Sequence, residues 1–161
     1  MMKTEFVWFL MTWTIGGLWV FLTMAAGLAA ITSNETVPLG MPALAGLTLW
    51  IFGFTIEIVA DKQKRDFKKD TSQENEFITS GLWAWSRHPN YFGEAIIWWG
   101  FYVIAVAVEG GWITFWSPVL AAISLRYGAG VPLVEALYKD SPEFQKWKET
   151  TSTFILLPKK N

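Results

Sequence analysis

The chain has 161 residues, the length of a single domain, and 52% of them are hydrophobic, with 11 Trp and 12 Phe. Because it has no Cys and only one His, disulfides, thiolate metal sites and His clusters are excluded. A net charge of -1 offers no broad basic surface for nucleic acid. The composition therefore predicts an integral membrane protein with no metal site and no nucleic-acid partner.

The first apolar run covers residues 6–31 and contains no ionisable residue. As a helix it would be about 39 Å long at roughly 1.5 Å per residue, which is enough to cross a bilayer. It exceeds the roughly 7 to 15 apolar residues of a cleaved signal peptide, so we expect it to stay in the protein. A second apolar run covers 38–60 and is interrupted only by Glu57. The short polar loop between the two runs predicts a helical hairpin.

Residues 61–90 form a polar middle segment, in which Asp61 to Ser80 lacks Gly and Pro and is expected to continue as helix. A third apolar run covers 91–108, and a fourth covers 112–137. The fourth run is interrupted by Pro118, Gly128, Gly130 and Pro132, so we expect it to be kinked or divided. The chain is thus predicted to be an all-α, polytopic bundle of about four transmembrane helices, or five if the last run divides.

Lys and Arg are distributed unequally among the predicted loops. Six lie between residues 61 and 90 and five after residue 136, whereas the loops at 32–37 and 109–111 contain none. By the positive-inside rule we expect both termini and the polar middle segment to face the cytoplasm.

Three ionisable residues, Glu57, Glu94 and Arg126, lie inside or at the edge of apolar runs. Such a group costs about 2.5 to 3.5 kcal/mol on insertion scales, so it usually faces the bundle interior and marks a site. Snorkelling to the interface or a structural ion pair would also account for these positions.

A series of charged residues begins at the end of the second run, where Glu57, Asp61, Arg65 and Lys68 follow one another at helical spacing. Carboxylates on this face can accept hydrogen bonds from ribose hydroxyls, and the two cations can neutralise phosphates. A juxtamembrane helix held near anionic lipid would show the same pattern.

A second polar group surrounds the start of the third run, in the sequence SRHPNYFGE at 86–94. Pro89 suits the first turn of a helix, after which Asn90, Glu94 and Trp98 share one face. The helix N-terminus and Arg87 would attract an anion, and Trp98 would stack on a planar ring. A purely structural role for these side chains is the alternative.

The segment GLWAWSRHPNYFGE at 81–94 resembles the C-terminal domain of the steroid 5-alpha-reductase family, in particular its bacterial membrane-protein branch. EIVADKQKR at 57–65, Leu125-Arg126 and TTSTFILLP at 150–158 extend the similarity over nearly the whole chain. Sterol reductases carry a similar Arg-His-x-Asn-Tyr segment, and isoprenylcysteine carboxyl methyltransferases share an Arg-His-Pro-x-Tyr-x-Gly core.

The resemblance implies an NADPH cofactor in a cavity that opens to the cytoplasm, and hydride transfer to a carbon–carbon double bond of a lipid or steroid-like substrate. It implies cofactor-binding residues in three parts of the chain: Glu57, Asp61, Arg65, Lys68, Arg87, His88, Asn90, Tyr91, Glu94, Trp98 and Arg126. The chain departs from the family pattern at Glu57, where the steroid enzymes have Asn, at Lys68, where they have Arg, and at Gly130, where His is expected.

The family's proton-donating Tyr and its partner Glu belong to an N-terminal half that this sequence does not match, so no catalytic residue carries over. Tyr91 and His88 are the candidates for a replacement proton donor. We expect that a second chain supplies the missing helices, or that the protein has another role. The functions that stay open are a membrane reductase or its cofactor-binding portion, an S-adenosylmethionine-dependent membrane methyltransferase, and a non-enzymatic membrane protein.

Overall fold

The computed structural model describes residues 2–69 and 77–159, and their regular structure is helical, which confirms the predicted all-α fold. The helices are, in chain order, α1 (Met2–Thr23), α2 (Ala25–Thr32), α3 (Met41–Lys68), η2 (Gly81–Ala84), α4 (Pro89–Ala105), η3 (Gly111–Phe115), α5 (Trp116–Tyr127), α6 (Val131–Ala136) and α7 (Pro142–Thr150).

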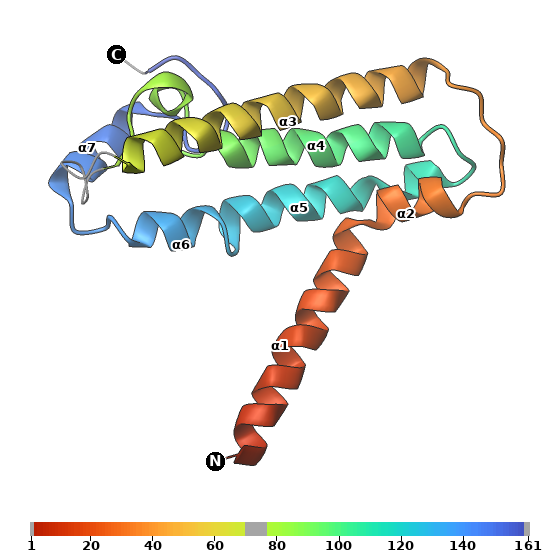
Figure 1. Cartoon of the computed structure of the whole chain (residues 1–161), viewed down its shortest axis with the longest axis horizontal. Coiled ribbons are helices and arrows are strands. Elements are labelled where there is room, and N and C mark those ends of the chain that lie inside the picture. Colours follow the sequence, from red (N-terminus) through yellow and green to blue (C-terminus); the bar gives the residue numbers. More distant parts are fainter. Residues whose placement is uncertain (1, 70–76, 160–161) are drawn as a thin grey trace.

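Helices α3 and α4 pack along their length as an antiparallel pair, and α5 lies beside α4 (Figure 1). The pair is close because glycines meet across the interface. A Cβ added to Gly46 on α3 would lie 2.6 Å from the carbonyl oxygen of Gly100 on α4. Without side chains at these positions the two backbones touch, as small residues allow between membrane helices.

Three segments are long and apolar enough to cross a membrane, namely Glu5–Thr23, Met41–Lys68 and Gly111–Ala136. Helix α4, with 17 residues, lies at the short end of the roughly 17 to 25 residues that span a bilayer. Each of the four apolar runs in the sequence therefore contains helix, and the chain is an integral membrane protein.

The predicted first run, 6–31, is divided at Met24 into α1 and α2. The Thr23 hydroxyl bonds back to the carbonyl of Trp19 at 3.0 Å, and the Thr23 carbonyl accepts a hydrogen bond from the Ser117 hydroxyl on α5. Back-bonding by Thr bends helices. From this point α1 diverges from the body formed by α3, α4 and α5 (Figure 1).

Two other predicted helical segments are not continuous helices in the structure. The fourth apolar run is divided into η3, α5 and α6, with the break between α5 and α6 at 128–130, where two glycines were expected to interrupt it. The predicted helix from Asp61 to Ser80 ends earlier, because α3 ends at Lys68 and residues 77–80 are not helical. Residues 70–76 of that prediction lie outside the described residues.

Candidate functional site

The predicted site residues lie on elements that meet at one end of the bundle. The last turns of α3, the first turns of α4 and the last turn of α5 lie together there, with η2, α6 and α7 around them (Figure 1). At the opposite end the loops 33–40 and 106–110 meet, and the Glu109 backbone N–H donates to Glu35 Oε2 at 3.1 Å. The predicted site residues and the two loops that lack Lys and Arg therefore lie at opposite ends of the bundle.

A cavity of about 610 Å³, here the large cavity, lies between α1, α4 and the end of α5. Tyr91, Glu94 and Trp98 line it from α4, so three of the predicted residues share one wall. The wall on α1 was missed by the sequence reasoning, although a signal was present. Thr12, Gly16 and Thr23 are small or polar and follow one another at helical spacing on one face of α1, which Ile15 and Trp19 share.

The carboxylates of Glu57, Asp61 and Glu94 are near enough to interact electrostatically. Their proximity follows from the tight contact of α3 with α4, since a Cβ on Gly93 would lie 2.8 Å from the backbone nitrogen of Glu57. Trp98 lies one turn after Glu94 on the same helix, and both side chains line the large cavity. This part of the site is therefore a group of carboxylates next to the indole of Trp98.

A second, open cavity of about 270 Å³ follows the end of α3 and is lined by Asp61, Lys64, Arg65 and Lys68. We call it the basic groove. The structure thus brings together three residues of the predicted charged series and adds Lys64, whose Nζ lies 5.3 Å from the ring centroid of Trp83. A groove with three cations and one carboxylate suits a ligand that carries phosphates and hydroxyls.

Arg87 and His88 are buried and share a carboxylate that the sequence analysis did not single out. Glu135 Oε1 lies 3.3 Å from Arg87 Nη2 and 3.3 Å from His88 Nε2, while Glu135 Oε2 lies 2.7 Å from Lys148 Nζ. Burial lowers the pKa of His88 to about 4, against the opposing effect of Glu135, so the imidazole is neutral at pH 7. Glu135 could have been noticed as another acid within an apolar run, as Glu57 and Glu94 were.

Buried polar atoms without a partner lie at the start of α4. Within the described part of the chain, Arg87 Nε and Nη1 and Asn90 Oδ1 have no hydrogen-bond partner. Burial also lowers the pKa of the Arg87 guanidinium, although Glu135 opposes this shift. Buried polar atoms are normally paired, so these donors and this acceptor are suited to a bound polar molecule.

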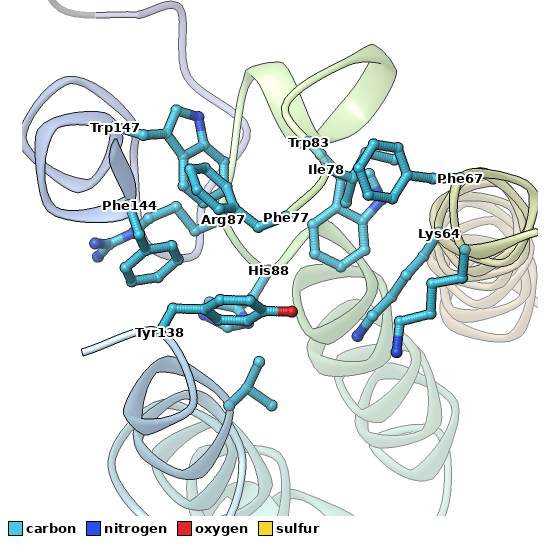
Figure 2. Close-up of a pocket in the computed structure, with 12 residues that line it drawn as sticks. Lys64, Phe67, Phe77, Ile78, Trp83, Arg87, His88, Tyr138, Phe144 and Trp147 are labelled. Atoms are coloured by element: carbon cyan, nitrogen blue, oxygen red, sulfur yellow. The ribbon is translucent and has the colours of Figure 1, made fainter. Parts of the chain in front are cut away.

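Aromatic rings from the middle and the C-terminal part of the chain enclose a small cavity of about 40 Å³ beside Arg87 and His88. Figure 2 shows Phe77, Tyr138, Phe144 and Trp147 on one side of this space and Lys64 on the other. The rings of Phe77 and Trp147 are 5.0 Å apart, and those of Tyr138 and Phe144 are 5.2 Å apart. Sequence reasoning missed this cluster, because its members are dispersed over 71 positions with no common period.

The C-terminal tail holds the start of α4 in place. Ser86 forms a parallel bridge with Ser152, the Arg87 backbone N–H donates to the Ser152 carbonyl at 2.8 Å, and the Ser86 hydroxyl donates to the Phe154 carbonyl at 2.9 Å. The Arg87 guanidinium also donates to the Thr153 hydroxyl. The tail segment 150–158 and the segment 81–94, which both take part in the family resemblance, are therefore in direct contact.

The remaining predicted residues are placed as follows. His88 and Tyr91 stack with parallel rings 5.4 Å apart, but only Tyr91 lines the large cavity. Arg126 lies 4.7 Å from the ring of Tyr127 and interacts electrostatically with Arg87. It is therefore beside the site, next to the cavity residue Leu125.

Comparison with known proteins matches residues 1–151 to a family described as "Protein of unknown function (DUF1295)". An uncharacterized protein of Schizosaccharomyces pombe is 30% identical over 55% of this chain and 31% of its own length. The 3-oxo-5-alpha-steroid 4-dehydrogenase 1 of Mus musculus is 31% identical over 42% of this chain and 26% of its own length. For the Homo sapiens protein of that name, the values are 30%, 46% and 29%. The chain spans less than a third of the length of these relatives, and no solved structure matches it.

Proposed function

Because this chain belongs to the DUF1295 family of steroid 5-alpha-reductase-like proteins, we propose that it binds NADPH and reduces a carbon–carbon double bond of a lipophilic substrate, or is the cofactor-binding portion of such a reductase. One observation carries the proposal. On a single face of α4, Asn90 presents a buried amide oxygen that has no partner among the described residues, and Glu94 and Trp98 line the large cavity.

The residues present fit a dinucleotide in their chemistry. The large cavity of about 610 Å³ is within the range of about 300 to 1,000 Å³ typical of ligand sites. Asn90 and Glu94 would bind polar groups of the cofactor, and Trp98 would pack along it. Arg65 and Lys68 in the basic groove would bind its phosphates, with Asp61 accepting from a ribose hydroxyl and Glu57 beside it. Arg126 would add a further phosphate contact.

A bound nicotinamide supplies the hydride. The chain's own contribution is to position the reactants and to handle the proton. Tyr91 lines the same cavity as Glu94, so its phenol is the group we assign as proton donor. His88 packs on the Tyr91 ring, but its Nε2 is held by Glu135. We therefore assign His88 to the positioning of Tyr91.

We further propose that the site faces the cytoplasm and is completed by helices outside this chain. The basic groove and Arg87 lie at the end that the positive-inside rule assigns to the cytoplasm. On α1 the large cavity is lined by Thr12, Gly16 and Trp19, yet the rest of that helix exposes large apolar side chains such as Phe9 and Phe21, 59% and 62% exposed. A second chain that packs beside α1 would enclose the cavity.

Ligand-dependent thermal stability of the detergent-purified protein tests the proposal. NADPH, NADH and S-adenosylmethionine are compared, because a ligand at about 100 times its dissociation constant adds roughly 2.7 kcal/mol. We expect stabilisation by NADPH. Asn90→Ala and Glu94→Ala should each weaken the affinity for NADPH by more than about tenfold, which corresponds to a loss of about 1.4 kcal/mol of binding free energy.

Lys69→Ala is the control, because Lys69 is exposed and pairs with Asp66 at 2.8 Å, away from the groove. Equal NADPH binding by all three variants would overturn the assignment of the α4 face. Stabilisation by S-adenosylmethionine alone would replace the reductase with a methyltransferase, and a response to no ligand would leave a non-enzymatic role.

A further inference from the structure

A further cavity of about 230 Å³, here the apolar cavity, lies between α2 and α4. Met24, Gly27 and Ile31 line it on one side, and Trp98 and Phe101 line it on the other. None of its lining residues is charged, in contrast to the large cavity, which contains Glu94. Such a lining suits a hydrocarbon group.

The two cavities adjoin at two places. Trp98 lines both of them, and the adjacent residues Thr23 and Met24 line the large and the apolar cavity respectively. The first apolar run divides at Met24. Because of this division, α1 lines the large cavity and α2 lines the apolar cavity. Trp98 is therefore the residue that the surroundings of Tyr91 and Glu94 share with the apolar cavity.

We propose that the substrate is a lipid with a conjugated polar end and a flexible, unbranched hydrocarbon chain. Its reactive end occupies the large cavity beside Tyr91 and Glu94, and its chain passes Trp98 into the apolar cavity. This inference rests on the proposed reductase function and names its substrate class. Because Trp98 lines both cavities, a molecule that occupies both must pass its indole, which a flexible chain can do more readily than a rigid fused-ring molecule.

Shape rather than hydrophobicity gives this selectivity. A lipid tail in the bilayer is already in an apolar environment, so moving it into the apolar cavity gains little hydrophobic free energy. The protein would distinguish one hydrocarbon chain from another by whether it fits the apolar cavity. Gly27 leaves room in that cavity because it has no side chain. A Cβ added to Gly27 meets nothing within 4 Å, so the backbone there has room for a side chain, and a large one would occupy space in the cavity that Gly27 lines.

The test uses photo-crosslinking of the detergent-purified chain in the presence of NADPH. The probes are straight-chain enones with a diazirine at the far end of a hexyl or a tetradecyl chain, and crosslinked residues are located by mass spectrometry. We expect the tetradecyl probe to label Met24, Ile31 or Phe101, and the hexyl probe to label residues of the large cavity. In Gly27→Phe, labelling of the apolar cavity by the tetradecyl probe should fall at least about tenfold.

Gly17→Phe is the matched control, because a Cβ at Gly17 also meets nothing within 4 Å and Gly17 lines neither cavity. Unchanged labelling in Gly27→Phe would overturn the inference, as would equal labelling by a tetradecane diazirine without the enone, since the cavity would then hold any bilayer lipid. NADPH-dependent stabilisation is measured on the same sample. Its presence without the expected labelling refutes the substrate class alone, whereas its absence refutes the proposed function.

Discussion

Gly53 on α3 and Gly93 on α4 face each other backbone to backbone. A Cβ added to either residue would lie 2.6 Å from the carbonyl oxygen of the other. This contact fixes the distance between the two helices that carry most of the candidate site, and it places Glu57 next to the first turns of α4.

Gly53→Ala is expected to force α3 and α4 apart, because the nearest atoms are backbone and cannot move independently. Overpacking of this kind costs about 1 to 3 kcal/mol. The variant should unfold at a lower temperature in detergent and should bind NADPH more weakly, since Glu57 and Glu94 lose their relative position. Gly17→Ala, with open space at its Cβ, should be neutral or slightly stabilising. Equal stability of the two variants would contradict the close contact.

The single His gives stability a defined pH dependence. Burial holds the pKa of His88 at about 4 in the folded protein, against about 6.5 in the unfolded chain. Between these values the unfolded chain binds the proton and the folded protein does not, so stability rises with pH from about 4 to about 6.5 and then levels off. The full effect is on the order of 3 kcal/mol.

His88→Asn should remove this part of the pH dependence. Thermal unfolding of both proteins between pH 5 and pH 7.5 measures the difference, and carboxylates other than Glu135, which contacts His88, contribute equally to the two curves. If the variant and the parent protein change in parallel over this range, His88 does not have a lowered pKa.

Glu135 holds Arg87, His88 and Lys148 together, and only 11% of its side chain is exposed. Glu135→Ala is expected to destabilise the protein by roughly 3 to 5 kcal/mol, because it leaves the buried Arg87 charge without its carboxylate. Glu143→Ala on the exposed surface of α7 is the control and should cost much less. Thermal unfolding in detergent measures both. A small effect at Glu135 would show that Arg87 does not depend on this ion pair.

The proposed orientation can be measured cleanly because the chain contains no Cys. Lys69→Cys and Lys139→Cys should react with a membrane-impermeant maleimide only after the cells are permeabilised, whereas Thr36→Cys should react in intact cells. The opposite labelling pattern would place the basic groove and the candidate site on the outer side.

Local sequence patterns were sufficient for much of the fold. A charge-free run such as 6–31 indicates burial in lipid, and the spacing of four, four and three residues from Glu57 to Lys68 indicates helical periodicity; both signals act within a few turns. The same periodicity placed Glu94 and Trp98 on one face, and both line the large cavity. The glycines at 128 and 130 indicated where the fourth run would break.

Tertiary contacts decided the rest. The bend at Met24 depends on Ser117, 93 positions later in the chain; the pairing of Arg87 depends on Glu135, and the position of Ser86 depends on Ser152. Such contacts bring together residues that share no period, so no local pattern encodes them. The sequence by itself determined a helical membrane protein with polar groups at one end. Only the packing of α3 against α4, and the divergence of α1, determined which of those groups share a cavity, because close approach of backbones depends on both partners at once.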